Sequence, residues 1–458
     1  MKTKLLLFLS IVFIAVSCQK YDADSPVNVL NNAEDDLGEG YITLERALSN
    51  ADFVYKNMEG YSYKQKRVRS VEVITGSRFE KRIDTRTESS IDDEDLPLAY
   101  VVNYENDGGY AILAADVLLP PIISLGDEGN FSTTDFVDFI TNSPDTRSTS
   151  NLNPVQEVQY AIISNSLSLP PFDFDIDLDL PIIGHDTTML LKCMPLVPVK
   201  WNQGNPYNYF APFDVSENAQ CLAGCVPVAG AQTLASLCYH HNFRPETQIS
   251  SDYPVDWYTI NKVISADTIR YTSGMCTPGS MAVASLIRAV GQDIDADYGV
   301  DATSGYTSRL VGTFDKLGLI SARYGNIDAI SREDIFDMIV VKNYPVPARA
   351  SRLDEEEEQI GHAFVLDGWL RLEYTRYGFS ASEGADSAVI ADRPDSFQHS
   401  FDLVHVNFGW GGNGDGYYLP DAFDLTNNEF FDYAEEEDNP YVSTRNYNLG
   451  VGYLIYDL

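Results

Sequence analysis

The fold of this chain is organised around residues 220–232, which read QCLAGCVPVAGAQ. Cys225 follows a glycine and begins a segment of mostly small or apolar residues that reaches His240, with no proline after Pro227. Proline is tolerated in the first turn of a helix, because the N–H that it lacks would have no helical partner there. We therefore predict a buried helix with Cys225 at its N-terminus.

A cysteine at the start of a helix has a chemical consequence. The positive end of the helix dipole favours an anion, so we expect a lowered pKa for the Cys225 thiol and a populated thiolate, which is the nucleophilic form. The alternative is a buried and inert cysteine, the commoner state of a free thiol. A nearby base would favour the first interpretation.

The chain has six histidines, and their spacing narrows the choice of base. His240 and His241 end the predicted helix, about 22 Å from the thiol at ~1.5 Å per residue. His362 begins an apolar, strand-like segment about 140 residues after Cys225, and papain-like enzymes separate nucleophile and base by ~130–150 residues. His405 lies two residues before Asn407, whose amide oxygen is suited to orient an imidazole. We interpret His405 itself as a strand residue with satisfied hydrogen bonds.

Four groups of segments, in this order and spacing, resemble the streptopain family of papain-like cysteine peptidases. Arg349 and the pair Asp256 and Trp257 also match positions of that family. The resemblance covers roughly residues 196–458 and, more loosely, the region before them. The four groups are WNQ at 201–203 with PYN at 206–208, GCVP at 224–227 with AQ at 231–232, GHAFVLDG at 361–368, and HVNFGWGG at 405–412 with DGYY at 415–418.

This resemblance implies the catalytic residues. Cys225 and His362 would form a dyad that hydrolyses peptide bonds through a thioester acyl-enzyme. The backbone N–H of Cys225 would be one donor to the oxyanion, and Gln220, five positions earlier, is the candidate for a side-chain donor. The dyad does not distinguish acyl acceptors, so a transamidase remains an alternative.

The same resemblance predicts the surroundings of the histidine. Asn407 is expected to orient His362, and Trp410 to pack over the site. Phe408 stands where the family motif has a tryptophan, a change that removes no acid–base group. The implied fold is α+β: a papain-like catalytic domain with a helical half and an antiparallel sheet half, and a cleft between them.

In residues 196–458 the spacing of apolar residues predicts helices in the first part and strands in the last part. This order is typical of an α+β domain. We predict helices beyond the Cys225 helix at 280–290, ending at Gly291, at 306–316, and at 334–342, opened by a capping box at Ser331. The predicted strands are 346–350, 362–369, 387–392, 403–408, 416–419 and 450–456.

Residues 41–145 predict a small α+β pro-domain. A helix is expected at 45–58, strands at 71–74 and 121–126, and a hairpin at 98–115 turning on NDGG at 106–109. The region resembles the propeptide of the streptopain family, which implies a zymogen whose pro-domain is an intramolecular inhibitor covering the active site. A permanent accessory domain is the alternative. Residues 146–195 are expected to be a linker containing the activation cleavage, with Arg147 and Lys192 among the candidates.

The N-terminus predicts export. Residues 1–17 have a basic start and an apolar run at 5–16 that is shorter than the ~20 residues of a membrane span, as in a signal peptide. The small residue Ser17 directly before Cys18 resembles the cleavage site of a bacterial lipoprotein signal. We therefore expect Cys18 to be lipidated and residues 18–40 to be a tether. An ordinary secretory peptide is the alternative. The expected location is the bacterial cell envelope or surface, with the membrane reached only through the lipid.

Composition limits the partners. With 31 basic and 68 acidic residues the net charge is −37, which disfavours binding to nucleic acid. Without Cys18, five cysteines remain, so at least one stays unpaired within the chain, and Cys225 fits that role. No zinc spacing accompanies them, and we expect neither metal nor cofactor. The expected partners are protein or peptide substrates; an inactive, peptide-binding lipoprotein is the alternative to an enzyme.

Overall fold

The structure is a computed structural model that describes residues 41–60, 64–75, 97–116, 119–136, 159–160, 162–163, 166–167, 182–265, 277–353, 359–378, 397–420 and 449–458. The predicted signal peptide and tether, lipidation at Cys18, the strand at 387–392 and Cys276 lie outside these residues. No helix in the described ranges is both long and apolar enough to cross a membrane.

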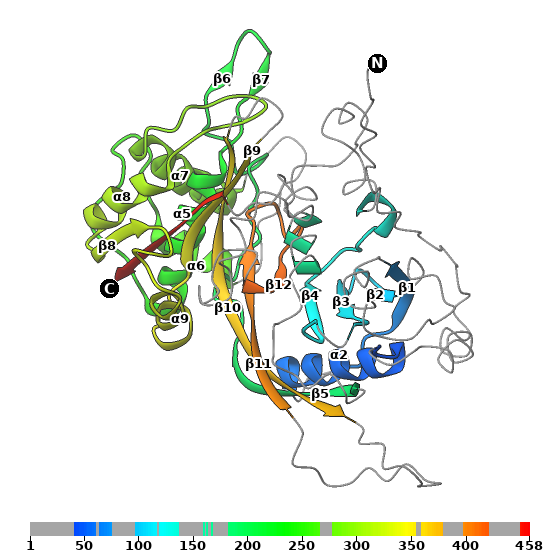
Figure 1. The fold of residues 1–458 in the computed structure, drawn as a ribbon. Helices are drawn as coiled ribbons and strands as arrows, with labels where there is room; N and C mark the ends of the chain where they lie inside the picture. The colour runs from blue at the N-terminus through cyan, green and yellow to red at the C-terminus, as the bar shows by residue number, and fades with distance from the viewer. Residues whose placement is uncertain are drawn as a thin grey trace, which may run out of the picture.

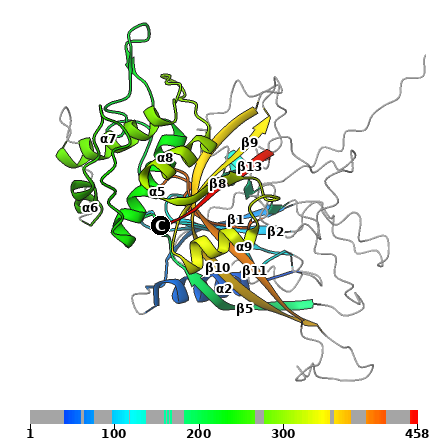
Figure 2. The ribbon, with the colours of Figure 1, turned by 90° about the vertical axis from the view of Figure 1, so that its left-hand side faces the viewer.

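One half of residues 196–458 is helical and is grouped on one side of the molecule (Figures 1 and 2). Its central helix is α5, Cys225–His241, whose side chains from Val226 to Cys238 are all buried. Around α5 lie α6 (Trp257–Ser265), α7 (Pro278–Asp293), α8 (Leu310–Leu317) and α9 (Arg332–Phe336), which continues as a π-helical turn, Asp337–Val341.

Two details of these helices follow from local chemistry. The capping box is confirmed: Ser331 accepts a hydrogen bond from the Asp334 N–H, and the Asp334 carboxylate accepts one from the Ser331 N–H. The prediction that Gly291 ends a helix was wrong, because α7 continues to Asp293. A Cβ at Gly291 would lie 2.0 Å from the Tyr298 hydroxyl, so a larger residue there would displace the Tyr298 side chain.

The other half is an antiparallel sheet that also includes strands from before residue 196. Its strand order is β1-β2-β3-β4-β12-β11-β10-β9-β13-β8, and β5 pairs with β10 outside this path. The α+β class is therefore confirmed. The strands are β1 (Val68–Thr75), β2 (Pro97–Tyr104), β3 (Tyr110–Ala114), β4 (Ile122–Gly126), β5 (Ile182–Cys193), β8 (Ile320–Gly325), β9 (Val346–Leu353), β10 (Gln359–Gly378), β11 (Phe397–Asn407), β12 (Gly416–Tyr418) and β13 (Leu449–Asp457). A separate hairpin consists of β6 (Phe213–Asp214) and β7 (Ala219–Gln220).

The N-terminal region has the expected elements, but it is not a separate layer. Helix α2 (Leu44–Glu59) and strands β1 to β4 occur where the sequence predicts them. Strand β4 then pairs with β12, so that Leu125 lies opposite Tyr417, and the sheet continues without a break from one region into the other (Figure 1). Edge-to-edge pairing of this kind depends on backbone groups, which side-chain patterns do not report.

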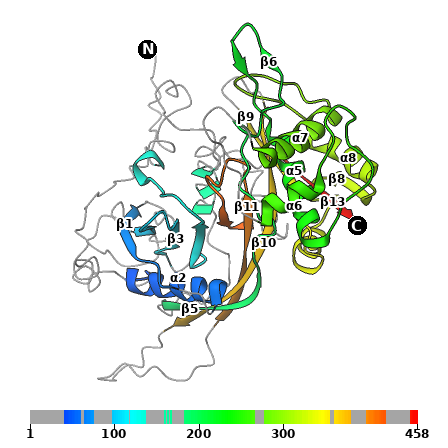
Figure 3. The same cartoon turned by 180° about the vertical axis from the view of Figure 1, so that it is seen from behind.

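The predicted linker contains a strand. Residues 182–193 of the expected 146–195 linker form β5, which pairs with the outer part of β10 from Trp369 to Gly378. Helix α2 packs along β5 (Figures 1 and 3), and the Lys192 ammonium lies 2.6 Å from the Asn57 carbonyl in the last turn of α2. Ordered structure thus begins before residue 196, and cleavage after Lys192 would cut inside a paired strand.

Candidate active site

The turn before Cys225 is built around Gly224. Its φ of 93° is in the left-handed region, and a Cβ there would lie 2.7 Å from the Cγ2 atom of Thr303. The Thr303 hydroxyl donates to the Leu222 carbonyl at 2.7 Å, and the Ala223 N–H donates to the Gln203 carbonyl at 2.8 Å. These bonds hold the chain so that Cys225 is the first residue of α5.

Cys225 is half-buried and faces β10. The backbone N–H groups of Ala363, Val226 and Cys225 point at its sulfur, and the charge of Arg349 acts on it from β9. Burial is the largest influence and raises the pKa of the thiol, whereas these N–H groups and Arg349 lower it without reversing the shift. The sequence-based expectation of a lowered thiol pKa is therefore wrong for this state, because loss of hydration disfavours the anion more than the helix terminus favours it.

His362 lies in β10, directly before Ala363, and is buried. Its Nε2 atom lies 2.9 Å from the Phe408 carbonyl oxygen. A carbonyl only accepts, so Nε2 carries the proton and Nδ1 is left as the acceptor. Burial lowers the pKa of His362 to about 4, against the effect of the Phe408 hydrogen bond, so the imidazole is neutral at pH 7. The Trp410 ring packs edge-on against His362, with the two ring centroids 5.2 Å apart.

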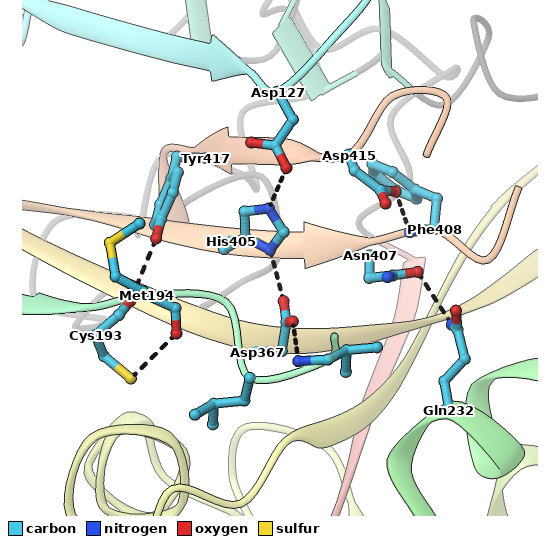
Figure 4. Close-up of polar contacts among 12 residues, drawn as sticks. Asp127, Cys193, Met194, Gln232, Asp367, His405, Asn407, Phe408, Asp415 and Tyr417 are labelled. Atoms are coloured by element: carbon cyan, nitrogen blue, oxygen red, sulfur yellow. Dashed lines mark hydrogen bonds and ion pairs between the residues drawn. The ribbon is translucent and has the colours of Figure 1, made fainter. Parts of the chain in front are cut away.

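Asn407 does not hold His362 directly. Its Oδ1 atom accepts from Gln232 Nε2 and from the Gly409 N–H, each at 3.0 Å, and its Nδ2 atom donates to the Val199 carbonyl at 3.0 Å. Figure 4 shows the Gln232 bond. The group bonded to His362 is instead the carbonyl of the Phe408–Gly409 peptide, whose N–H is bonded to Asn407. The expected direct bond between Asn407 and His362 is replaced by this indirect one.

Gln220 and Gln203 both lie near the turn before Cys225, but they have different hydrogen-bond partners. Gln220 ends β7, and its side-chain amide donates to the Ala211 carbonyl, across the β6–β7 hairpin. Gln203 lies beside the turn that precedes Cys225, through the bond from Ala223 to its carbonyl. Gln203 belongs to the WNQ segment at 201–203, so its sequence signal is the family motif that contains it.

A second cluster of charges surrounds His405 on β11 (Figure 4). The His405 ring is buried between two carboxylates: Nδ1 is 2.6 Å from Asp367 Oδ1 and Nε2 is 3.2 Å from Asp127 Oδ2. Both carboxylates accept, so both ring nitrogens carry protons. Burial alone would lower the pKa of His405, but the two carboxylates raise it well above 6.5. His405 is thus a satisfied strand residue, as predicted, with Asp127 contributed by the N-terminal region.

The described side chains point to thiol chemistry. Within these residues, no three histidine, cysteine, aspartate or glutamate side chains come together as metal ligands would. Cys193, Cys221, Cys225 and Cys238 are free thiols, and of these four only Cys225 is not fully buried. A half-buried thiol beside the strand that carries a neutral imidazole can act as a nucleophile with a base at hand.

Comparison with known proteins gives two family matches in consecutive parts of the chain. Residues 42–141 match the model of the Spi protease inhibitor, and residues 201–418 match the model of the Peptidase C10 family. Streptopain from Streptococcus pyogenes is 23% identical over 358 residues, covering 70% of this chain and 74% of streptopain.

Two solved structures from Prevotella intermedia also match. A fragment of prointerpain A is 21% identical with a TM-score of 0.43, covering 78% of this chain and 94% of the fragment. Active interpain A, a cysteine protease, is 20% identical with a TM-score of 0.38, covering 58% of this chain and 95% of that chain.

Proposed function

Because the chain belongs to the Peptidase C10 family, the streptopain family of papain-like cysteine peptidases, and carries an inhibitor-like pro-domain, we propose that it is an exported cysteine endopeptidase made as a zymogen. Cys225 is the nucleophile and His362 is the base. The observation that carries this proposal is that the N–H of Ala363, the neighbour of His362, faces the Cys225 sulfur at the start of α5.

Neutral forms of both side chains are the starting point of the proposed reaction. The Cys225 thiol transfers its proton to Nδ1 of His362 as Sγ attacks the scissile carbonyl carbon, forming the C–S bond. The Cys225 N–H, at a helix start, donates to the oxyanion. His362 then protonates the leaving amine as the C–N bond breaks, and a thioester remains. Water then attacks the thioester carbon as it loses a proton to Nδ1. The C–S bond breaks, the acid product leaves, and the imidazolium returns the proton to Sγ, which regenerates the thiol.

The tautomer of His362 supports these roles. The bond from Nε2–H to Phe408 keeps the lone pair on Nδ1, as a general base requires, and stabilises the imidazolium formed during the reaction. Trp410 packs against the same ring and limits its rotation and its access to water. Asn407 acts one step away, by holding the peptide whose carbonyl contacts His362.

We assign inhibition to the pro-domain. Asp127, which follows β4, binds both His405 and the carbonyl of Asp415, and Glu128 pairs with Lys200 at 3.1 Å. These contacts attach the N-terminal region to β11, to the loop that follows Trp410 and to the segment around Lys200. Cleavage in residues 146–195 would separate the pro-domain, at about 41–145, from the catalytic domain, at about 196–458 with β5 retained on β10.

The test is self-conversion of the purified chain starting at Gln19. We expect it to convert to a C-terminal fragment, detected by gel and N-terminal sequencing, unless a thiol-blocking reagent is present. Cys225→Ala and His362→Ala should remain uncut, whereas Cys221→Ala, which removes a buried thiol in the same turn, should convert. Conversion of Cys225→Ala under the same conditions would overturn the proposal.

If no form converts, trace protease followed by a thiol-dependent peptide assay decides between the enzyme and an inactive, peptide-binding lipoprotein. We also propose that Cys18 is lipidated and anchors the protein at the cell envelope or surface. Mass spectrometry of the N-terminal peptide, with Cys18→Ser as control, tests this separately; an unmodified Cys18 would indicate ordinary secretion.

A further inference from the structure

The main chain of Phe408 is held on both sides. Its carbonyl lies 2.9 Å from His362 Nε2, and its N–H lies 2.9 Å from Oδ1 of Asp415 (Figure 4). The position of the His362 ring therefore depends on the main chain of Phe408. That main chain is in turn held by the carboxylate of Asp415, seven residues further along the chain.

The glycines in the loop between Phe408 and Asp415 do not by themselves impose one conformation on it. Glycine loses more conformational entropy on ordering than any other residue and imposes little preference of its own. Asn407 holds the Gly409 N–H on one side of the Phe408 carbonyl, but a flexible loop would still let that carbonyl move away from the imidazole unless a second group clamps the main chain at the Phe408 N–H. Four glycines of this loop have φ between 70° and 92°: Gly409, Gly411, Gly412 and Gly414.

Asp415 is placed to be that clamp. It is 2% exposed and directly precedes β12, so it is anchored by the sheet. Its N–H donates to the Gly412 carbonyl at 3.2 Å, and its own carbonyl accepts from the Asp127 N–H at 3.0 Å. The side chain reaches back across the loop to Phe408, the last position before the run of glycines.

Building on the proposed Cys225–His362 dyad, we propose that Asp415 is a positioning residue for the reaction. Its carboxylate accepts the Phe408 N–H, fixes the Phe408 carbonyl, and thereby holds Nδ1 of His362 toward the Cys225 thiol. Asp415 touches no reacting atom; it acts through one residue of main chain.

Burial of this carboxylate carries a cost in stability. Burial raises the pKa of Asp415 to about 7, against the Phe408 hydrogen bond and the charge of His405, and the carboxylates of Asp127 and Asp367 add to the increase. A carboxyl group with a raised pKa in the folded state destabilises the fold as pH rises above its ordinary value of 3.8. An asparagine would avoid this penalty and keep an acceptor oxygen.

The experiment compares Asp415→Ala and Asp415→Asn with the wild type, all as chain 19–458 processed by trace protease. In Asp415→Ala we expect kcat to fall on the order of ten- to a hundredfold, with KM changed by less than about threefold, because misorientation affects the chemical step more than substrate binding. Asp415→Asn should keep kcat within about threefold of wild type, because its amide oxygen still accepts from Phe408.

Two further measurements separate positioning from general destabilisation. The NMR resonance of the His362 Nε2 proton should shift or broaden in Asp415→Ala and persist in Asp415→Asn. Asp402→Asn is the matched control: Asp402 is also a buried carboxylate, on β11, but it pairs with Arg332 and Arg371. It should lower thermal stability without changing kcat of the folded protein. If Asp415→Ala does not fold, Asp415→Ser, whose shorter side chain does not span the same distance, replaces it.

Three outcomes would overturn the inference: an unchanged kcat in folded Asp415→Ala, equal losses in Asp415→Ala and Asp415→Asn, or the same loss in Asp402→Asn. The proposed function fails separately, if Cys225→Ala retains activity or if the processed wild type has no thiol-dependent activity. An inactive Cys225→Ala with a fully active Asp415→Ala would leave the enzyme assignment in place and remove the positioning role.

Discussion

Burial disfavours the charged forms of both Cys225 and His362. Burial raises the pKa of the thiol and lowers that of the imidazole to about 4. The pair is therefore neutral in this state, in which Asp127 and Glu128 of the N-terminal region contact the neighbouring loop and Lys200. Groups that favour the thiolate, namely backbone N–H groups and Arg349, are present but are outweighed.

Arg349 tests this balance at a single residue. It lies on β9 opposite Ala363 and lowers the pKa of Cys225 through its charge. We expect Arg349→Gln to raise the thiol pKa, so that alkylation of Cys225 by iodoacetamide at neutral pH becomes slower and its pH midpoint moves upward. Arg323→Gln, a change to an exposed arginine on β8 that pairs with Asp334, should leave the midpoint unchanged. If the pH midpoint of alkylation shifted equally in both variants, the effect would come from the change in net charge and not from the position of Arg349.

The two glutamines make a second residue-level prediction. If an amide side chain completes the oxyanion hole, Gln203 is better placed than Gln220, because Gln203 is bonded to the turn before Cys225 whereas the Gln220 amide is engaged by Ala211. We expect Gln203→Ala to lower kcat by about 10²–10³, as loss of an oxyanion donor does elsewhere, and Gln220→Ala to have a smaller effect. Steady-state kinetics of the processed enzyme decide; a larger loss for Gln220→Ala would restore the sequence-based assignment.

At the scale of elements, α5 and the end of β11 must keep a fixed relation, because one carries Cys225 and the other leads into the segment that binds His362. Gln232 joins them. It is fully buried on α5, its Nε2 donates to Asn407 Oδ1 at 3.0 Å, and its Oε1 accepts from the Trp201 N–H at 3.2 Å. One side chain thus connects the cysteine helix to the segment at Trp201 and to the end of β11.

Gln232→Glu removes the donor without changing the shape of the side chain. Two acceptor oxygens would then face each other in a buried place, so we expect the free energy of unfolding to fall by about 1–3 kcal/mol. We also expect kcat to fall, because Asn407 would no longer be held. Chemical denaturation and peptide kinetics measure the two effects. Unchanged stability in Gln232→Glu would contradict the observed bond to Asn407.

At the scale of the whole molecule, the N-terminal region is joined to the catalytic region by backbone pairing and by charge. Strands β4 and β12 share a ladder, α2 packs along β5, and Asp127 reaches His405 (Figures 1 and 4). Separation of the pro-domain must break all three kinds of contact. We therefore expect cleavage of the connection alone to leave the two parts associated at first.

The Asp127–His405 pair predicts a pH dependence for this association. The pKa of His405 is raised above 6.5 and that of Asp127 is lowered below 3.8, although burial alone would act in the opposite sense on each. The pair therefore stabilises the joined state fully between these two ordinary values. Its contribution is lost as pH rises through the raised pKa of His405 or falls through the lowered pKa of Asp127. Asp367, Asp415 and Tyr417 face the same ring, and Lys200 and Lys66 act on Asp127.

The measurement uses the uncut Cys225→Ala chain and the same chain with Asp127→Asn. The difference in their free energies of unfolding should be largest near pH 5–6 and should shrink at alkaline pH as His405 loses its proton. Glu105→Gln, on a half-buried carboxylate that follows β2, serves as control for the loss of one negative charge. A difference that grows with alkaline pH would show that the sign assigned to His405 is wrong.

Much of the local structure could be predicted from the sequence. The spacing of apolar residues and the capping residues predicted α2, α5, α8, the capping box at Ser331 and most strands. These features are predictable because each depends on residues close together in the chain. The four motif groups also sufficed to predict the family, which the family comparison supports. The thiol at the start of α5 and the histidine at the start of an apolar strand were likewise visible as a pattern of residues.

Tertiary structure alone decided what holds and tunes those residues. The group that binds His362 is a backbone carbonyl of Phe408, and backbone carbonyls are the same in every sequence. The raised pKa of Cys225 and the raised pKa of Asp415 come from burial by distant segments, which composition does not encode locally. The continuous sheet through β4 and β12 likewise joins strands about 290 residues apart through main-chain hydrogen bonds, and such pairing leaves no residue-specific mark in either segment.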